Sequence, residues 1–358
     1  MHIPDGYLSP TTCAVLTAAM VPVWATAARR AQRVVKSRYA PMMAVGSAYA
    51  FLVMPFNVPI PDGTTAHAVG AVLIAVLLGP WAATISVSTA LLIQALFFGD
   101  GGVLAFGANA FNMAFVMPFV GYGIYRLVAG DAALTSSRRA LAAGVGGYVG
   151  LNVAALVTAI EFGLQPTLFH SADGTPLYAP FHLAQTIPAM ALAHLTVAGF
   201  VEFALTVGVV TYLQRANLPL LRLNHPDVAV SGDEVVRRPL SWRWAFYGLA
   251  AMIVLSPLGL LAPGGAFGED APAHLDLAKY HLGAVPQGLN SYTGWWSHAV
   301  LDGYGFSGGS TARLGYWVSA IVGAIAVGVV IALLIGAIRL VGALRGDGDG
   351  DVAEAGAA

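Results

Sequence analysis

Long apolar stretches, separated by short polar connections, run through most of the chain. A membrane-spanning helix needs about 20 predominantly apolar residues, and a sheltered helix can use fewer. The stretches that approach this pattern lie at residues 11–28, 40–56, 67–79, 80–98, 104–128, 139–162, 185–214, 244–262 and 315–342. The pattern predicts an all-α integral membrane protein, in which a seven-helix bundle is followed by a two-helix membrane domain.

The third and fourth stretches form one apolar run that is too long for a single span. Gly79 and Pro80 interrupt this run, and proline begins helices more readily than it continues them. We therefore expect a short helix and then a longer one, joined by a tight turn. Thr64 or Thr65 could cap the short helix.

Polar segments predict how the chain is divided. Residues 1–215 hold seven predicted spans, and residues 216–243 contain prolines and charges that are typical of a cytosolic linker. Residues 244–342 hold two spans joined by a long outer loop, and the small, acidic residues 343–358 predict a disordered tail.

Arginine and lysine gather in four connections, and cytoplasmic loops carry an excess of these residues. The four groups are Arg29, Arg30, Arg33, Lys36 and Arg38; Arg126, Arg138 and Arg139; Arg215, Arg222, Arg237, Arg238 and Arg243; and Arg339 and Arg345. With nine spans, all four fall on one side. We therefore predict a multi-pass protein of the cell (plasma) membrane, with its amino terminus outside and its carboxyl terminus in the cytoplasm.

The composition agrees with a membrane protein and excludes several functions. The chain is 57% hydrophobic and 10% charged, with a mean hydropathy of +0.72, whereas soluble domains carry about 25% charged residues. No Gly-Lys-Ser/Thr follows a glycine-rich turn, so we expect no ATPase site in this chain. HExxH is also absent, and Cys13 is the single cysteine, which excludes an internal disulfide. The net charge of −1 does not indicate a nucleic-acid partner.

The first ten residues, MHIPDGYLSP, place chemistry at the beginning of the chain. The α-amine of Met1, the amide nitrogen of His2 and one imidazole nitrogen of His2 can chelate one cation in adjacent five- and six-membered rings. The amide must lose its proton, which Cu(II) or Ni(II) can promote. Such nitrogen ligation favours a square-planar metal and leaves one corner open.

A second stretch, PDGTTAHAVG at residues 61–70, offers His67 as the fourth nitrogen. It lies where an outer loop meets a predicted helix. Spacing alone does not require a metal site, because a histidine near a chain end is commonly solvated and a lone histidine at a helix start commonly serves packing.

MHIPDGYLSP and GTTAHAVG closely resemble signatures of the CbiM/NikM family, the substrate-capture (S) components of energy-coupling-factor transporters for cobalt and nickel. The resemblance covers about residues 1–215. It implies that the terminal amine and main-chain amide, together with two imidazoles, hold the metal, which matches Met1, His2 and His67. It also implies seven helices, a membrane scaffold subunit and two ATPase subunits that drive transport.

The carboxyl-terminal part resembles a fused N subunit of the same systems. SPLGLLAPGGAFGED, residues 256–270, is similar to the family's PDGLE-type region, although Leu258 stands where that pattern has aspartate. The resemblance implies that this part helps to load or gate the S part.

Other polar residues are candidates for a supporting role. A metal-bound imidazole usually has its other nitrogen held by an acceptor. Candidates by position are Asp5, Asp62, Asn57, Asn109 and Asn112. For the last two, a polar contact between helices is an equal alternative. Glu161, His194 and Glu202 lie within predicted spans and either line a hydrated cavity or, as we favour, form structural hydrogen bonds.

Small residues recur in the second predicted span. Ala40, Ala44 and Ala48 follow one another every four residues, a spacing that lets helices approach closely. Related S components use such a surface against their scaffold, so this face is a candidate coupling surface. Packing within the chain is the alternative.

These observations predict a permease subunit that captures a divalent metal and is not an enzyme. We favour Ni(II), because eight d electrons tolerate square-planar ligation, whereas Co(II) more often takes more ligands. Cobalt uptake for cobalamin biosynthesis by the same mechanism, a membrane metalloenzyme and an autonomous secondary transporter are the alternatives. No catalytic cofactor is expected.

Overall fold

The computed structural model describes residues 1–36, 40–60, 64–230, 242–262, 265–306 and 311–344. Helix forms within each of the nine apolar stretches. The longer elements are α1 (Pro10–Arg30), α3 (Pro41–Val53), α4 (Ala71–Leu78), α5 (Pro80–Phe98), α7 (Met117–Ala129), α8 (Ser137–Leu168), α9 (Leu183–Ala193), α10 (Gly199–Ala216), α12 (Trp242–Leu255) and α14 (Ala312–Leu344). The chain is therefore an all-helical membrane protein, apart from one small hairpin.

Shorter elements join or extend these helices. They are α2 (Gln32–Lys36), α6 (Phe106–Asn109), the π-helices η1 (Ala110–Val116) and η2 (His194–Ala198), α11 (Leu218–Arg222), α13 (Gln287–Tyr292), the 3₁₀ helices η3 (Ser256–Leu261), η4 (Pro272–His274) and η5 (Asp302–Tyr304), and the antiparallel strands β1 (Val58–Pro59) and β2 (Thr65–Ala66). The hairpin of β1 and β2 precedes α4, in the connection that the apolar pattern leaves between the second and third predicted spans.

Six helices in the described part of the chain are long and apolar enough to cross a membrane. They are Pro10–Arg30, Pro80–Phe98, Phe106–Ala129, Ser137–Leu168, Leu183–Ala216 and Ala312–Val341. The helix α4 has only eight residues, which is about 12 Å at 1.5 Å per residue. All eight are buried, so other helices shelter this element from lipid.

Local sequence explains where several helices begin. Ser9 caps α1, because its Oγ accepts a hydrogen bond from the Thr12 N–H at 3.0 Å, and Pro10 follows as the first helical residue. The expected break in the long apolar run is confirmed: α4 ends at Leu78, Gly79 has a φ of 89°, and α5 begins at Pro80.

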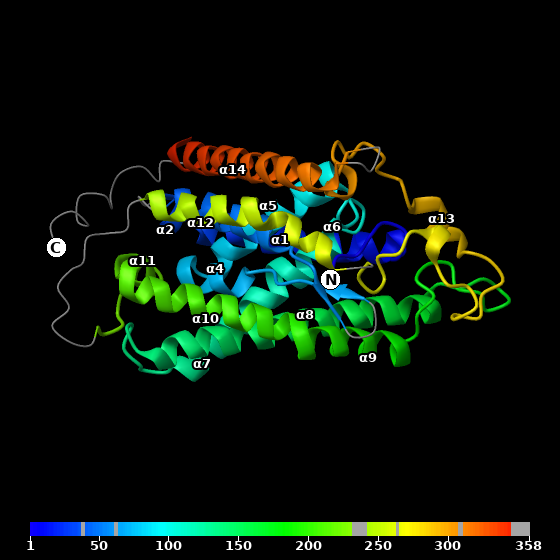
Figure 1. The fold of residues 1–358 in the computed structure, drawn as a ribbon, viewed down its shortest axis with the longest axis horizontal. Coiled ribbons are helices and arrows are strands. Elements are labelled where there is room, and N and C mark those ends of the chain that lie inside the picture. The colour runs from blue at the N-terminus through cyan, green and yellow to red at the C-terminus, as the bar shows by residue number, and fades with distance from the viewer. Residues whose placement is uncertain (37–39, 61–63, 231–241, 263–264, 307–310, 345–358) are drawn as a thin grey trace.

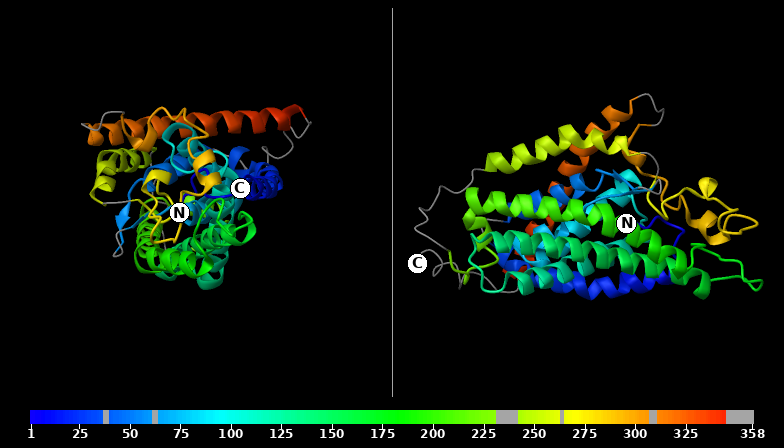
Figure 2. Two further views of the ribbon diagram at one scale, coloured as in Figure 1. Left: turned by 90° about the vertical axis from the view of Figure 1, so that its right-hand side faces the viewer. Right: turned by 60° about the horizontal axis from the view of Figure 1, so that its bottom comes forward.

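The long helices run along one axis of the molecule, with α14 on one side and α7, α8 and α10 on the other (Figure 1). The helix α4 lies inside, where it contacts α5, α7, α8 and α10. The N-terminus and α13 lie towards the same end of the long axis. Seen from that end, the N-terminus lies among the helices (Figure 2).

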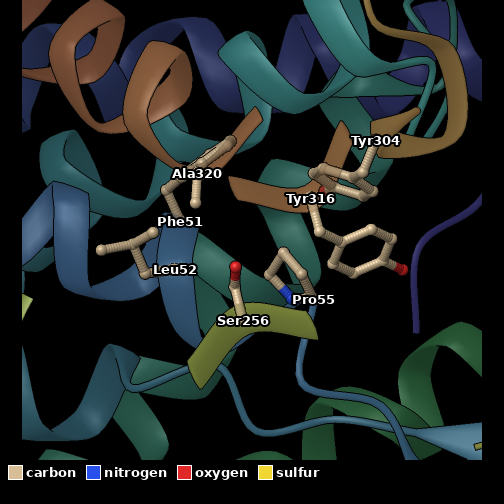
Figure 3. A pocket seen from close by; sticks show the side chains of 7 residues that line it. All are labelled: Phe51, Leu52, Pro55, Ser256, Tyr304, Tyr316 and Ala320. Atoms are coloured by element: carbon tan, nitrogen blue, oxygen red, sulfur yellow. The ribbon is translucent and has the colours of Figure 1, made fainter. Parts of the chain in front are cut away.

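The last part of the chain packs on the first. The helix α14 contacts α3 and α5, and Tyr304 stacks on Phe98 with ring centroids 5.1 Å apart. A cavity of about 10 Å³ lies at this boundary (Figure 3). Its lining comes from both parts: Phe51, Leu52 and Pro55 from the first, and Ser256, Tyr304, Tyr316 and Ala320 from the last.

The alanine face of α3 takes part in packing within the chain. Ala40 and Ala48 are 3% and 4% exposed, and Ala44 is partly buried against the core. The partners of α3 include α5, α12 and α14. These contacts favour intramolecular packing over a surface that is free for the scaffold.

Candidate metal centre

The first residues of the chain are buried inside one end of the bundle. Met1 and His2 are each 3% exposed, and Ile3 is fully buried. The Ile3 N–H donates to Asn109 Oδ1 at 2.8 Å, and the Ile3 carbonyl accepts from Asn109 Nδ2 at 3.0 Å and from the Gly102 N–H at 2.8 Å. Asn109 thus holds both polar groups of one peptide residue and fixes the position of His2 beside it.

The Pro-Asp-Gly turn continues this docking. The carboxylate of Asp5 accepts hydrogen bonds from the N–H groups of Val103 and Ala105, both at 3.1 Å. Burial raises the pKa of the Asp5 carboxyl, and these backbone hydrogen bonds oppose that shift. Gly6 has a φ of 93°, a conformation that glycine adopts without strain. Beyond the turn, the Ser9 N–H donates to Gln165 Oε1 at 2.9 Å.

A glycine-rich loop after α5 makes room for the docked segment. A Cβ atom on Gly102 would lie 2.0 Å from Asp5 Oδ1 and 2.6 Å from Asp5 N. Gly101, with a φ of 79°, lies next to it, and a Cβ there would be 3.4 Å from the His2 ring. The two backbones can approach this closely only because residue 102 has no side chain.

His67 lies in the connection between β2 and α4. Its Nδ1 lies 3.0 Å from the Ala68 carbonyl oxygen, so Nδ1 is the protonated nitrogen that donates. Thr65 does not cap the following helix, because it forms part of β2. The helix begins later, at Ala71, with Gly70 in its N-cap position.

The two sequence-predicted histidines come together. The ring centroids of His2 and His67 lie 5.0 Å apart, and His67 is 4% exposed. Each ring has a buried Nε2 without a hydrogen-bond partner among the residues that the structure describes. Burial, with smaller contributions from the Met1 amine and His2, holds the pKa of the His67 imidazole well below its usual range. A neutral imidazole with a free nitrogen is the form that binds metals, and His67 presents such a nitrogen at its Nε2.

Both histidines line a cavity of about 200 Å³ at the end of the bundle where the N-terminus lies. Its polar lining also includes Asn57, Asp100, Glu269 and Tyr304. The last two belong to the connection between α12 and α14, so the carboxyl-terminal part closes one side of this cavity.

Two carboxylates contact the nitrogens of the predicted chelate. The Met1 amine lies 3.3 Å from Glu269 Oε1, and His2 Nδ1 lies 3.2 Å from Asp100 Oδ1. Asp100 is held in turn by hydrogen bonds from the Tyr304 hydroxyl and from Gln94 Nε2. A six-membered chelate ring that contains the metal and the His2 amide nitrogen must use Nδ1. This is the imidazole nitrogen nearer the main chain. The ring therefore has to leave Asp100 before the chelate can close.

Side chains alone do not provide a metal site in the described part of the chain. No three His, Cys, Asp or Glu residues there are grouped as metal ligands would be. The other donor groups beside His2 and His67 are the Met1 amine and the carboxylates of Asp100 and Glu269.

The other predicted supporting residues lie in different places. Asn109 and Asp5 anchor the amino-terminal segment, as described above, and Asn57 lines the cavity. Asn112 lies elsewhere, because its Nδ2 donates to Thr158 at 3.1 Å and to Glu161 at 2.7 Å. Asp62 lies outside the described residues.

Sequence reasoning missed both carboxylates of the cavity. Asp100 could have been found, since Gly-Asp-Gly-Gly between two apolar stretches is unusual for a plain turn. Glu269 carries no local signal, because its contact with Met1 joins residues 268 positions apart.

Comparison with known proteins adds an independent finding. Residues 2–220 match the family model described as CbiM, cobalt uptake substrate-specific transmembrane region. The chain is 46% identical, over 96% of its length and 98% of the relative's, to the fused nickel transport protein NikMN of Rhodobacter capsulatus. It is also 46% identical to the probable fused nickel transport protein LarMN of Lactiplantibacillus plantarum, over 90% and 93% of the two chains. A crystal structure of a truncated transition metal transporter, 62% identical, matches 60% of this chain and 99% of its own with a TM-score of 0.57.

Proposed function

Because the chain belongs to the CbiM family of substrate-specific transmembrane regions for cobalt uptake, we propose that it is the metal-capturing subunit of an energy-coupling-factor importer for Ni(II). Membership of a transport family means that the chain is not an enzyme. The observation that carries the proposal is the pair of buried imidazoles, 5.0 Å apart, on one outer cavity. Nickel is favoured over cobalt because the two relatives matched over most of their lengths are described as fused nickel transport proteins.

The proposed ligands are the Met1 amine, the His2 amide, the His2 imidazole and the His67 imidazole. Burial of Met1 and His2, and the position of the His2 ring 5.0 Å from that of His67, support this set. Four nitrogens suit a square-planar Ni(II). The free Nε2 of His67 can provide the fourth nitrogen without losing the hydrogen bond at its Nδ1.

We propose that residues 1–215 form the S component, residues 216–243 a cytosolic linker and residues 244–342 an N-like domain. Residues 343–358 would be a tail, of which 345–358 lie outside the described part of the chain. The six long helices, with α3 and α4 in the first part and α12 in the last, support a count of seven plus two spans. The alanine face remains a candidate scaffold contact only if the partners of α3 separate.

The proposed orientation places the metal centre outside and the basic connections in the cytoplasm. Arg339 donates from its Nε to the Val35 carbonyl at 3.0 Å, which brings the end of α14 to the connection after α1. Arg139 donates to the Tyr125 hydroxyl at 2.8 Å, beside Arg126. Figure 1 places α2 and α11 at the end of the molecule opposite the N-terminus, as this orientation requires.

The proposed partners are a membrane scaffold subunit and two ATPase subunits. No P-loop occurs in the sequence, so the energy for transport has to come from other chains. Uptake of nickel by cells that express this chain without ATPase partners would instead favour an autonomous transporter.

The decisive experiment compares the chain with a version that carries one extra residue before Met1. Isothermal titration with nickel chloride should show binding by the first chain, whose start at Met1 is checked by intact mass. The extended version should not bind, because the amine has moved away from the His2 amide. Equal binding by both would reject the ligand set, and a parallel titration with cobalt chloride tests the metal preference.

A further inference from the structure

Glu202 lies in α10, and its side chain reaches the connection between β2 and α4. Its Oε2 accepts hydrogen bonds from the Val69 N–H at 2.8 Å and the Gly70 N–H at 3.0 Å, and its Oε1 lies 3.2 Å from the same Gly70 nitrogen. Only 1% of Glu202 is exposed. An ionisable group buried in a membrane protein is costly and points to function by default, so this contact requires an explanation beyond packing.

The carboxylate anchors the N-cap residue, Gly70, of a helix that has no side-chain cap of its own. The first N–H groups of a helix lack partners within it, and negative charge stabilises that end. Gly70, the N-cap residue of α4, has a φ of 75° and offers no side chain for this purpose. A Cβ on Gly70 would also lie 2.3 Å from Tyr49 Cε1. The beginning of α4 is thus held by Glu202 on one side and confined by Tyr49 on the other.

The two anchored residues, Val69 and Gly70, lie two and three positions after His67. Ala68 and Val69, which connect His67 to Gly70, are 2% and 0% exposed, so the connection has little freedom to adjust. His67 is tied to the same connection through the 3.0 Å contact of its Nδ1 with the Ala68 carbonyl. Anchoring Val69 and Gly70 therefore sets the position from which His67 Nε2 faces the cavity. Metal ligands have to be held within about 0.5 Å of the productive geometry.

We propose that Glu202 is a positioning residue of the metal centre, which holds His67 in place by anchoring Val69 and Gly70 at the beginning of α4. The inference rests on the proposed nickel site, and Glu202 acts through main-chain atoms without touching the metal. A glutamine carbonyl oxygen at the Oε2 position could keep both hydrogen bonds, but the glutamine NH₂ would face the Gly70 N–H, which lies 3.2 Å from Oε1. Glu202→Gln therefore removes the negative charge and weakens the anchor of Val69 and Gly70 with almost no change in volume.

The first test is isothermal titration of the purified full chain with nickel chloride. Glu202→Gln should weaken binding about 10- to 100-fold, the range found when groups that orient metal ligands are lost. Glu161→Gln is the matched control, because Glu161 is also buried but accepts from Asn112 at 2.7 Å. It should bind nickel as the unchanged chain does. The visible absorption of the nickel complex in Glu202→Gln should shift in the same direction as in His67→Ala.

A double-mutant cycle separates positioning from a general loss of structure. If Glu202 acts through His67, then adding Glu202→Gln to His67→Ala should weaken binding by less than about twofold, which is the usual error of additivity. Additive losses, or a Glu202→Gln chain with unchanged affinity and absorption, would overturn the inference. If Glu202→Gln does not fold, Glu202→Asp replaces it in the test, because aspartate keeps the charge one methylene further back. Glu202→Asp should bind nickel more weakly than the unchanged chain does. Unchanged binding by Glu202→Asp would also overturn the inference.

The outcome also distinguishes this inference from the proposed function. Absence of nickel binding by the unchanged chain, or unchanged binding by His67→Ala, would reject the metal site itself and the positioning role with it. Weakened binding in His67→Ala together with unchanged binding in Glu202→Gln rejects only the positioning role.

Discussion

Replacing Asn109 with alanine should undock the amino-terminal segment without touching any proposed metal ligand. The side chain satisfies the Ile3 N–H at 2.8 Å and one lone pair of the Ile3 carbonyl at 3.0 Å. After Asn109→Ala the carbonyl keeps its bond from Gly102 at 2.8 Å, whereas the N–H loses its acceptor. A buried donor without a partner costs about 1–3 kcal/mol.

This cost falls on the docked state, which is the state that can bind the metal. Since about 1.4 kcal/mol corresponds to a tenfold change in a binding constant, nickel affinity should fall about 5- to 150-fold. Isothermal titration measures the affinity, and hydrogen exchange of residues 1–9 should show reduced protection in the metal-free variant. Asn152→Ala is the control, because Asn152 Nδ2 donates within α8 to Tyr148 at 2.8 Å. An Asn109→Ala chain with affinity within about twofold of the unchanged chain, and with unchanged protection, would refute the reasoning.

Three further expectations concern the same segment and the opposite end. Gly102→Ala should weaken nickel binding at least about fivefold, because its Cβ would lie 2.6 Å from Asp5 N and overpacking costs about 1–3 kcal/mol. Gly123→Ala is the control and should bind nickel normally, because its Cβ would meet nothing within 4 Å. Nickel titrations in two buffers with different protonation enthalpies should give different heats, since the amide has to release its proton, and equal heats would argue against amide ligation. Arg139→Met should lower the melting temperature, because it removes the 2.8 Å hydrogen bond to Tyr125 near the basic connections. Nickel affinity should stay unchanged, and a change in affinity would contradict our placement of the metal centre at the opposite end of the bundle.

The helical framework follows from the apolar pattern, and the beginning of α4 shows the limit of that pattern. Gly79 and Pro80 mark the break between α4 and α5 because both residues have strong local preferences. At the other end, the stretch from His67 to Gly70 is apolar and was predicted to be helical, yet the helix begins at Ala71. The left-handed Gly70 and the distant Glu202 decide that boundary, and neither is visible in a local window.

The metal centre was predictable only in part, for a similar reason. His2 and His67 were identified because each lies in a recognisable short motif, and their rings meet at 5.0 Å. Asp100 and Glu269 come to the same cavity through tertiary packing, from the connection after α5 and from that between α12 and α14. Hydropathy places helices in a membrane but does not say which loops meet above them.

The way in which the amino-terminal segment is held links the proposed metal capture to the folding of this end of the bundle. Its main chain is bonded by Asn109 from α6, by Gly102 from the loop after α5, and by Gln165 from α8. The carboxyl-terminal part adds Thr293, whose hydroxyl donates to the Asp5 carbonyl at 3.2 Å. Each of these bonds is modest by itself, but together they hold the segment in which the His2 ring lies 5.0 Å from that of His67, and we propose that this arrangement precedes the arrival of a cation. Binding then does not have to order a free chain end, an ordering that would cost about 1–2 kcal/mol for each backbone residue that is fixed.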